Sequence, residues 1–444
     1  MQTKTKLQHT LHAISHGLPR TVLTIFGATG DLAMHYLLPA LVQMCEQGLL
    51  AKDFSLVCVG RRPFSITEFM AEIRLQNPNL KFSPKTLKKF QSFLHYYQGE
   101  FDDAESFVGL KQLLADKDLG KGHVCSNRLY YFATAPQYFE PLARMLKSQG
   151  LLIGCTEHQR TIRLLVEKPF GYDLQSAKKL NSVLRKFFLE QQIYRIDHYL
   201  GKETVQNLLV IRFANDLFEP VWNKKYIDHV QISGLESAGV KNRINFYDQT
   251  GAMKDLVQNH MLQMLALIAM EEPKDLSAES IRTSKVKVLK ALPKFTSKTI
   301  STNLVRGQYK EYSQEVGKRS NTETFVAFKT FINNPRWEGV PFYLRTGKRL
   351  NKKITEISIH FKKKCALFGS DQRADNVLTF RIQPDESVQM QINNKVPGFG
   401  IQLHRGSLDF GYKTAFLTEI PGAYERLLLD FIQGDQRLFI RSDE

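Results

Sequence analysis

Residues 21–33, TVLTIFGATGDLA, join a short apolar run to a glycine-containing turn and the start of a helical pattern. A continuous apolar run with β-branched residues is typical of a strand buried in a parallel sheet. Backbone N–H groups in such a turn can approach a pyrophosphate at the N-terminus of the following helix. The glycine fingerprint is incomplete, because Ala28 and Ala33 stand at its first and third positions when Gly30 is the second. Turns of this kind also occur without a ligand. The candidate nucleotide-binding residues here are Gly27, Ala28, Thr29, Gly30, Asp31 and Leu32.

Three further apolar runs have the character of this first strand: FSLVCV at residues 54–59, RLYYFA at 128–133 and TIRLLV at 161–166. Helical stretches separate them, and in residues 174–190 Leu180 and Leu184 lie on one apolar stripe. Continuous apolar strands that alternate with helices predict a parallel sheet covered on both faces. The first part of the chain is therefore predicted to be an α/β, doubly wound, Rossmann-type domain.

The pattern changes after about residue 200, where a helical stretch at 251–270 precedes segments of alternating apolar and polar residues. These segments cover residues 326–332, 355–362, 376–384 and 387–393. Alternation with a period of two predicts antiparallel strands with one solvated or helix-covered face. We therefore expect a flexible tail at 1–20, a Rossmann-type domain at 21–200, and an α+β domain with a large, mostly antiparallel sheet at 201–444.

The composition is that of a globular protein, with 444 residues, of which 43% are apolar and 24% charged. No apolar run approaches the ~18–20 residues needed to cross a bilayer, and residues 1–20 lack the apolar core of a signal peptide. The five cysteines are dispersed, without C-x-x-C pairs or zinc-like spacing. Because such cysteines suit a reducing compartment, we expect a cytoplasmic protein with no membrane partner and no metal site.

A formal net charge of +17 invites comparison with proteins that bind nucleic acid. The positive charges are spread over segments such as 85–89 and 178–186, and no basic run is interleaved with aromatic residues. We therefore favour an enzyme that binds acidic small molecules and expect no nucleic-acid partner.

The second predicted strand ends in VGRRP, which places Arg61 and Arg62 after it. NAD enzymes tend to have a carboxylate at this position for the ribose 2′-hydroxyl, whereas an arginine suits the 2′-phosphate of NADP. Two exposed loop arginines are the alternative explanation. Together with the glycine turn, Arg61 favours NADP, and use of NAD stays open.

VEKPFG, at residues 166–171, places Glu167 and Lys168 at the end of another predicted strand. In open parallel sheets, ligands bind at the carboxyl ends of the strands. A strand-end lysine before a proline turn is about as common without any function, so this motif alone does not decide the matter.

YRIDHYLGKE, at residues 194–203, gathers Asp197, His198, Tyr199 and Lys202. If the segment is helical, His198 and Lys202 lie one turn apart on one face. A histidine, a phenol and an ammonium group together suit a phosphate dianion. A lone Asp-His pair is more often a surface hydrogen bond, so the hypothesis depends on the whole cluster.

His260, in KDLVQNHMLQML, shares a helical stripe with Leu256 and Met264. Such a histidine is by default a core residue with its hydrogen bonds satisfied. The alternative is a partly buried general base, because the reference pKa of imidazole is near ~6.5. Asp197 is the candidate carboxylate to fix its tautomer, although the sequence does not show that the two meet.

These motifs resemble the glucose-6-phosphate dehydrogenase family. GATGDLA, EKPFG, RIDHYLGKE, QNLLVIRFAN, KDLVQNHMLQ, GVPFYLRTGKRL and AYERLLLD occur in the family's order and cover the chain from about residue 21 to its end. RIDHYLGKE is highly specific to that family. The resemblance implies a Rossmann domain and an α+β domain whose large sheet supports assembly as a homodimer or homotetramer.

The resemblance implies oxidation of glucose 6-phosphate to 6-phosphogluconolactone, with hydride transfer from carbon 1 to NADP, the first step of the oxidative pentose phosphate pathway. His260 would be the base and Asp197 its orienting carboxylate. Lys168 would lie between substrate and nicotinamide and contact both.

The remaining site residues implied by the resemblance bind the substrate. The residues that would hold the sugar phosphate are His198, Tyr199 and Lys202. Glu236 and Asp255 would bond the sugar hydroxyls, and Lys348 and Lys353 would close the substrate pocket.

Several positions depart from the family pattern. Met34, His35 and Tyr36 replace the basic residues that usually follow GDL, which removes a cofactor phosphate contact. Lys254 stands where an arginine usually precedes the helix aspartate and lacks its planar fork. Gly422 replaces an acidic residue of the structural NADP site of some animal members, and the chain ends at RSDE, so we expect no such site.

Two alternatives stay open at this point. The first is a related oxidoreductase that uses NAD or another phosphorylated sugar. The second is a catalytically impaired homologue or a basic binding protein that retains the fold, against which the intact His260, Asp197 and Lys202 argue.

Overall fold

The computed structural model describes residues 18–80, 82–118, 126–153, 161–240, 243–363, 367–368, 374–416 and 420–444. The chain forms two compact units. The first unit comprises the chain up to His198 together with Gly422–Asp443, and the second comprises Tyr199–Pro421 and Glu444.

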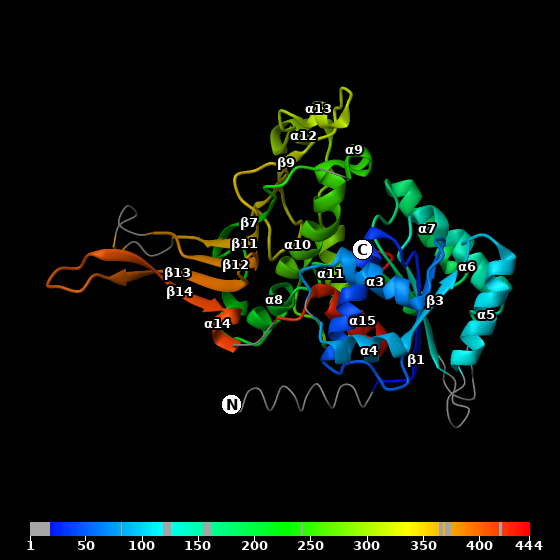
Figure 1. The fold of residues 1–444 in the computed structure, drawn as a ribbon. Helices are drawn as coiled ribbons and strands as arrows, with labels where there is room; N and C mark the ends of the chain where they lie inside the picture. Colours follow the sequence, from blue (N-terminus) through cyan, green and yellow to red (C-terminus); the bar gives the residue numbers. More distant parts are fainter. Residues whose placement is uncertain are drawn as a thin grey trace. The chain divides into compact units, whose positions relative to one another are not determined.

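The first unit is built on a seven-stranded sheet in the order β15-β6-β5-β4-β1-β2-β3 (Figure 1). All neighbouring strands run parallel except β15, which pairs antiparallel with β6. Its strands are β1 (Thr21–Phe26), β2 (Ser55–Gly60), β3 (Leu94–Gln98), β4 (Asn127–Phe132), β5 (Ile162–Val166), β6 (Ile193–Ile196) and β15 (Phe439–Ile440). This strand order is that of a Rossmann-type sheet with one added edge strand.

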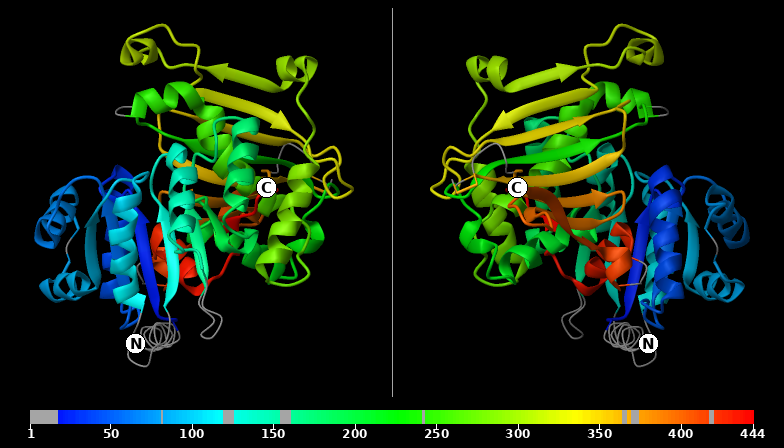
Figure 2. Two further views of the ribbon diagram at one scale, coloured as in Figure 1. Left: turned by 90° about the vertical axis from the view of Figure 1, so that its right-hand side faces the viewer. Right: turned by 90° about the vertical axis from the view of Figure 1, so that its left-hand side faces the viewer.

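Helices cover both faces of this sheet (Figure 2). Leu23 and Ile25 of β1 face a core with α2 (Leu38–Glu46), α3 (Ile66–Gln76), α4 (Pro84–Phe93) and α15 (Ala423–Gln433). Val22 and Phe26 face a second core with α5 (Ala104–Asp118), α6 (Phe139–Ser148) and α7 (Leu174–Arg185). Alternate residues of one strand therefore enter opposite cores, as the continuous apolar run predicts. The short helices of this unit are η1 (Ala33–Leu37), η2 (Pro136–Tyr138) and η3 (Glu190–Gln192).

The observed division of the chain differs from the expected one at its C-terminal end. Residues 422–443 were expected in the second domain, but they belong to the first unit. There α15 packs against α2, and Leu427, Leu428 and Phe431 enter the same core as β1. The reason is physical: the apolar face of α15 is buried against α2, and β15 extends the edge of the sheet at β6.

The second unit contains an eight-stranded sheet in the order β14-β13-β12-β11-β7-β10-β9-β8, in which only β7 and β10 pair in parallel. Its strands are β7 (Ile227–Leu235), β8 (Leu304–Gly307), β9 (Phe325–Thr330), β10 (Phe342–Gly347), β11 (Ile354–Phe361), β12 (Val377–Gln383), β13 (Ser387–Lys395) and β14 (Leu403–Gly411). Strands β13 and β14 project as an arm from one edge (Figure 1). The predicted fold class, a Rossmann-type domain and an α+β domain with a large, mostly antiparallel sheet, is confirmed.

The helices of the second unit are α8 (Glu203–Phe213), η4 (Glu219–Val221), α9 (Ile244–Ala252), η6 (Met253–Met261), α10 (Leu262–Ala269), α11 (Ala278–Lys290), α12 (Ser297–Asn303), α13 (Tyr312–Val316) and α14 (Tyr412–Phe416). Helix η6 packs against β7 and β10, where Gly234 allows the side chain of Leu256 to approach the sheet closely. The hydrogen bonding of η6 is that of a π-helix, a form found frequently at functional sites.

Two of the cysteines, Cys45 and Cys58, are buried with free thiols. Cys125, Cys155 and Cys365 lie outside the described residues, as does most of the expected tail at 1–20. Within the described ranges, no helix has the length and apolar character required to span a membrane.

Candidate functional site

The glycine turn after β1 has a backbone that only glycine fits at its first position. Gly27 has a φ of +86°, and a Cβ there would lie 2.6 Å from the carbonyl oxygen of Ala133. Its N–H and that of Ala28 both donate to the carbonyl of Val59, at 3.0 and 3.1 Å. The turn is thereby tied to the end of β2, and glycine at its first position lets the backbone lie close to the end of β4.

The helix after this turn begins with unpaired backbone donors. Its helical residues start at Asp31, and the first intrahelical bond runs from Met34 N–H to the Gly30 carbonyl at 3.0 Å. The N–H groups of Asp31, Leu32 and Ala33 therefore lie in the first turn, where a helix has no internal acceptor for them. Such donors and the helix dipole suit the pyrophosphate of a dinucleotide.

Of the three residues that depart from the family pattern, one is buried and two are exposed. Met34 is buried, and His35 Nδ1 lies 3.1 Å from the carboxylate of Asp31. The ring of Tyr36 lies 5.6 Å from that of Tyr424 on α15. None of the three offers a cation of the kind that lysine or arginine would supply here.

The two arginines after β2 have different surroundings. Arg62 donates from Nη2 to the Thr29 carbonyl at 2.7 Å, so it braces the glycine turn. Its guanidinium also lies 5.6 Å from the centre of the Phe64 ring. Arg61 is exposed, and its side chain makes no hydrogen bond or ion pair with the residues that the structure describes. Arg61 is thus the arginine that a bound 2′-phosphate could engage at no cost to the fold.

Glu167, which follows β5, is buried and contacts two tyrosines. The Tyr131 hydroxyl donates to its carboxylate at 2.6 Å, and the Tyr424 hydroxyl also hydrogen-bonds the carboxyl group. Burial raises the pKa of Glu167 to about 7, although the tyrosine hydrogen bonds and the charge of Lys168 oppose the shift. Lys168, the next residue, is only partly buried and lies at the carboxyl edge of the sheet.

The buried carboxyl of Glu167 should make stability depend on pH. Below its ordinary value of 4.5 the group is protonated in the folded and unfolded states alike, and between 4.5 and about 7 only the unfolded chain ionises readily. The free energy of unfolding therefore decreases as pH rises through this window. Relative to Glu167→Gln, the wild-type free energy of unfolding should fall by on the order of 2 kcal/mol between about pH 5 and 8, measured by urea denaturation. Parallel pH profiles for the two proteins would contradict the shift.

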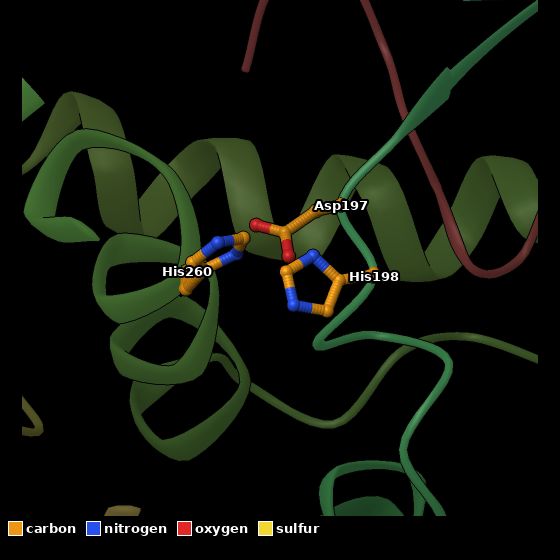
Figure 3. A group of neighbouring side chains, drawn as sticks. All are labelled: Asp197, His198 and His260. Carbon is orange, nitrogen blue, oxygen red and sulfur yellow. The ribbon is translucent and has the colours of Figure 1, made fainter. Parts of the chain in front are cut away.

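Asp197 and His198 follow β6 directly, and His260 lies on η6 (Figure 3). Asp197 is buried, with 2% of its surface exposed, whereas His198 is partly buried. The condition under which His198 and Lys202 would share a helical face is not met, because residues 198–201 form a turn and α8 begins only at Glu203. The first unit ends at His198, so Tyr199 and Lys202 belong to the second unit.

His260 and Tyr199 stack face to face within the second unit. Their ring centroids are 4.2 Å apart and the planes differ by 20°. His260 is 1% exposed and Tyr199 is 7% exposed, so the contact is shielded from water. The Tyr199 hydroxyl lies 3.4 Å from Thr355 Oγ1 on β11, which holds the ring in place.

Lys202 contacts the same Tyr199 ring and is hydrogen-bonded to a residue of β12, the strand next to β11. Its Nζ lies 5.2 Å from the Tyr199 ring centre and donates to Gln383 Oε1 at 2.8 Å. Gln383 in turn donates to Thr355 at 3.2 Å. Burial lowers the pKa of Lys202, Lys353 adds to that effect, and Glu386 opposes it. The structure therefore gathers His260, Tyr199 and Lys202 in one buried network.

A second group of predicted residues surrounds Tyr247 on α9. Lys348 forms an ion pair with Glu236, and its Nζ lies 5.4 Å from the Tyr247 ring centre. Asp255, 7% exposed, lies near enough to Tyr247 to raise the pKa of its hydroxyl, an effect that burial dominates and Glu236 reinforces. Glu236, Asp255 and Lys348 are thus brought together.

Lys353 is exposed. Within the described residues, its one link to the other predicted site residues is its positive charge, which lowers the pKa of Lys202.

Several residues that shape the site were not identified from the sequence. Tyr247 and Gln383 carry no motif signal, because their contacts come from other strands and helices. Glu323 accepts from Met253 N–H at 3.0 Å and so caps η6 from a distant loop. Gly251 makes this possible: its φ is +67°, and a Cβ there would lie 2.5 Å from the Glu323 carboxylate. The only sequence signal was a glycine just before the helical pattern.

Comparison with known proteins gives two family matches, which together cover nearly the whole chain. Residues 24–207 match the family described as "Glucose-6-phosphate dehydrogenase, NAD binding domain", and residues 209–444 match "Glucose-6-phosphate dehydrogenase, C-terminal domain". The glucose-6-phosphate 1-dehydrogenase of Chlamydia pneumoniae is 44% identical over 96% of this chain and 87% of its own length. That of Bacillus subtilis is 41% identical over 96% of this chain and 89% of its own.

Solved structures agree with the sequence relatives. A glucose-6-phosphate dehydrogenase in complex with its substrate glucose-6-phosphate superposes with a TM-score of 0.89 at 35% identity, covering 96% of this chain and 89% of that one. The glucose-6-phosphate 1-dehydrogenase from Mycobacterium avium gives a TM-score of 0.83 at 34% identity with the same coverage. The chain belongs to the glucose-6-phosphate dehydrogenase family.

Proposed function

We propose that this protein oxidises glucose 6-phosphate to 6-phosphogluconolactone, with NADP as the hydride acceptor. The observation that carries the proposal is the buried network of the second unit, in which an imidazole and an ammonium group contact the same Tyr199 ring. A base beside an anion-binding cation is what oxidation of a phosphorylated sugar requires. The relatives named glucose-6-phosphate 1-dehydrogenase support the same assignment.

His260 is the proposed base. It takes the proton of the hydroxyl on carbon 1 as that carbon loses its hydride, so that the C–O single bond becomes the lactone carbonyl. Bound NADP supplies the hydride-accepting nicotinamide. Asp197 is proposed to fix the tautomer of His260. It precedes Tyr199 by only two residues, and the Tyr199 ring stacks on the imidazole, which supports a position near that histidine.

The substrate would be held by the two groups of residues that the second unit assembles, together with residues of the first. Lys202, Tyr199 and His198 are proposed to bind the phosphate, which would restore the solvation that Lys202 loses on burial. Glu236 and Asp255 are proposed to accept from the sugar hydroxyls, while Lys348, paired with Glu236, and Lys353 close the pocket. Lys168 is proposed to contact both the substrate and the nicotinamide.

The residues of the first unit fit a dinucleotide. The turn at Gly27 leaves no room for a side chain against the Ala133 carbonyl, and the first helical turn after it presents N–H donors. Arg61 is proposed to bind the 2′-phosphate that distinguishes NADP from NAD.

Substituting Arg61→Ala should raise the KM for NADP about tenfold, because a charge-assisted contact to the phosphate is lost, and should change the KM for NAD by less than about twofold. Steady-state kinetics with each cofactor measures both values. Arg62→Ala provides the contrast, since Arg62 braces Thr29 and its loss should weaken both cofactors alike. Equal losses of NADP and NAD binding in Arg61→Ala would remove the residue from the 2′-phosphate site.

A homodimer through the large sheet is the proposed assembly, and a homotetramer would be a pair of such dimers. Large apolar side chains are exposed on one face of its strands, among them Val305 and Tyr343. Exposed apolar surface on a sheet face is typical of a subunit interface. The free, buried thiols of Cys45 and Cys58 support the cytoplasm as the proposed compartment.

Absorbance at the reduced-nicotinamide band, with glucose 6-phosphate and either NADP or NAD, tests the proposal. Turnover that is faster with NADP at equal concentration is the expected result. Turnover with NAD alone would retain the reaction and overturn the cofactor assignment. No turnover with either cofactor, in a protein that binds both ligands, would leave an impaired homologue as the correct description.

A further inference from the structure

Tyr424 lies in the first turn of α15, the helix that returns from the second half of the chain to the first unit. No motif in the sequence assigns it a role. Its side chain nevertheless contacts residues from three other parts of the first unit: Tyr36 on η1, Glu167 after β5 and His198 after β6.

The ring of Tyr424 is parallel to the imidazole of His198. The ring centroids are 6.1 Å apart and the planes differ by only 6°. His198 lies in the turn that follows β6 and is partly buried. A parallel aromatic neighbour limits rotation of the imidazole out of its plane and so favours one orientation of the ring plane.

Tyr424 is itself held by its hydroxyl. That hydroxyl hydrogen-bonds the buried carboxyl group of Glu167, to which Tyr131 donates from β4 at 2.6 Å. Burial is the largest cause of the raised pKa of the Tyr424 hydroxyl, and the negative charge of Glu167 is the next. The hydroxyl therefore stays protonated and remains a donor throughout the working pH range. The Tyr36 ring, 5.6 Å away, adds a further aromatic contact to the same side chain.

We propose that Tyr424 is a positioning residue that holds His198 in the orientation needed to bind the substrate phosphate. The inference rests on the proposed function, which gives His198 a phosphate contact. An imidazole that is already oriented loses less conformational freedom when the phosphate binds, so affinity increases without any direct contact from Tyr424. Tyr424 thus acts on substrate binding rather than on the hydride transfer.

Three variants test this role, all in the full chain. Tyr424→Leu removes the ring and the hydroxyl, Tyr424→Phe removes the hydroxyl alone, and Tyr131→Phe removes the matching hydroxyl on Glu167 without touching His198. We expect Tyr424→Leu to raise the KM for glucose 6-phosphate about fivefold or more, with kcat changed less than about twofold. Tyr424→Phe should raise this KM less than Tyr424→Leu does, because it keeps the ring and loses only the hydrogen bond to Glu167, and Tyr131→Phe should stay within about twofold of the wild-type KM. The KM for unphosphorylated glucose should not change in any of the three.

A double-substitution cycle shows whether the effect passes through His198. In the background of His198→Ala, adding Tyr424→Leu should leave the KM unchanged, because the ring that it orients is gone. Additive effects would overturn the proposal, as would a wild-type KM in Tyr424→Leu or an equal rise in KM for glucose.

Folding and the proposed function are checked separately. Binding of NADP, measured by isothermal titration calorimetry, shows that the first unit of each variant is folded. If Tyr424→Leu fails this check, Tyr424→Met takes its place in the cycle with the same expected result. If wild-type protein binds NADP but does not turn over glucose 6-phosphate, the proposed function fails. Wild-type activity with no effect at Tyr424 means that the positioning role alone fails.

Discussion

His260→Asn should lower kcat for glucose 6-phosphate oxidation by about 10²- to 10⁴-fold, the range expected when a general base is lost. The hydroxyl proton on carbon 1 then has no acceptor in the protein as hydride leaves. The KM for glucose 6-phosphate should change by less than about threefold, because the proposed phosphate contacts are made by other residues. Stopped-flow and steady-state assays give both parameters.

The pH profile adds an independent test of His260. In the wild type, kcat/KM should fall on the acid side as the imidazole protonates, and this limb should disappear in His260→Asn. His95→Asn, which alters a half-buried histidine on β3, is the matched control and should retain wild-type kinetics. Wild-type turnover in His260→Asn would mean that another group is the base.

Lys202→Ala should raise the KM for glucose 6-phosphate about 10- to 100-fold, as expected for loss of a charge-assisted contact in a partly desolvated site. Burial lowers the pKa of Lys202, because water solvates its ammonium group poorly there. A bound dianion would therefore interact strongly with this cation. The KM for unphosphorylated glucose should change by less than about twofold. The difference between the two sugars is therefore the diagnostic measurement.

Two variants control for general effects of removing a lysine. Lys225→Ala removes an exposed lysine of the second unit and should leave both KM values unchanged. Lys202→Arg keeps the charge but changes its shape, and should give an intermediate KM because the longer guanidinium displaces the contact with Gln383. If Lys202→Ala weakens both sugars equally, Lys202 does not bind the phosphate.

Much of the sheet in the first unit could be predicted from the sequence. The run at 21–26 is β1 from end to end, and the run predicted at 54–59 is β2 shifted by one residue. These strands are buried on both faces, so composition alone marks them. The helix predicted at 174–190 instead ends at Arg185, and Leu174 at its start is exposed, because a stripe of leucines does not show where the partner surface stops.

The helical stretch predicted at 251–270 is only partly regular. Its first residue, Gly251, has a non-helical backbone, and η6 and α10 follow in place of one α-helix. Periodicity of 3.6 residues assigns such a stretch to helix but cannot reveal a π-helix, whose hydrogen bonds span one more residue. His260 therefore lies on a helix, as expected, but the sequence does not reveal that Glu323, remote in the chain, caps the start of that helix.

The site was predictable as far as its residues lie in compact motifs. RIDHYLGKE and KDLVQNHMLQ supplied Tyr199, Lys202 and His260, and the structure joins these three through a single ring. Gln383 contacts Lys202 and Tyr247 contacts Lys348 from other strands and helices. No local sequence pattern predicts contacts of this kind. Tyr424 lies in the motif AYERLLLD, and the position of this motif in the first unit is set by tertiary packing.

The return of residues 422–443 to the first unit has a consequence for biosynthesis. On the ribosome, β1 to β6 emerge first, yet the core around α2 lacks Leu427, Phe431 and Phe439 until the last turns of the chain appear. The intervening stretch of roughly 220 residues takes about 10 to 45 s to translate at the usual rates. During that interval an apolar surface stays open on the nascent polypeptide, which makes it a natural client for a chaperone.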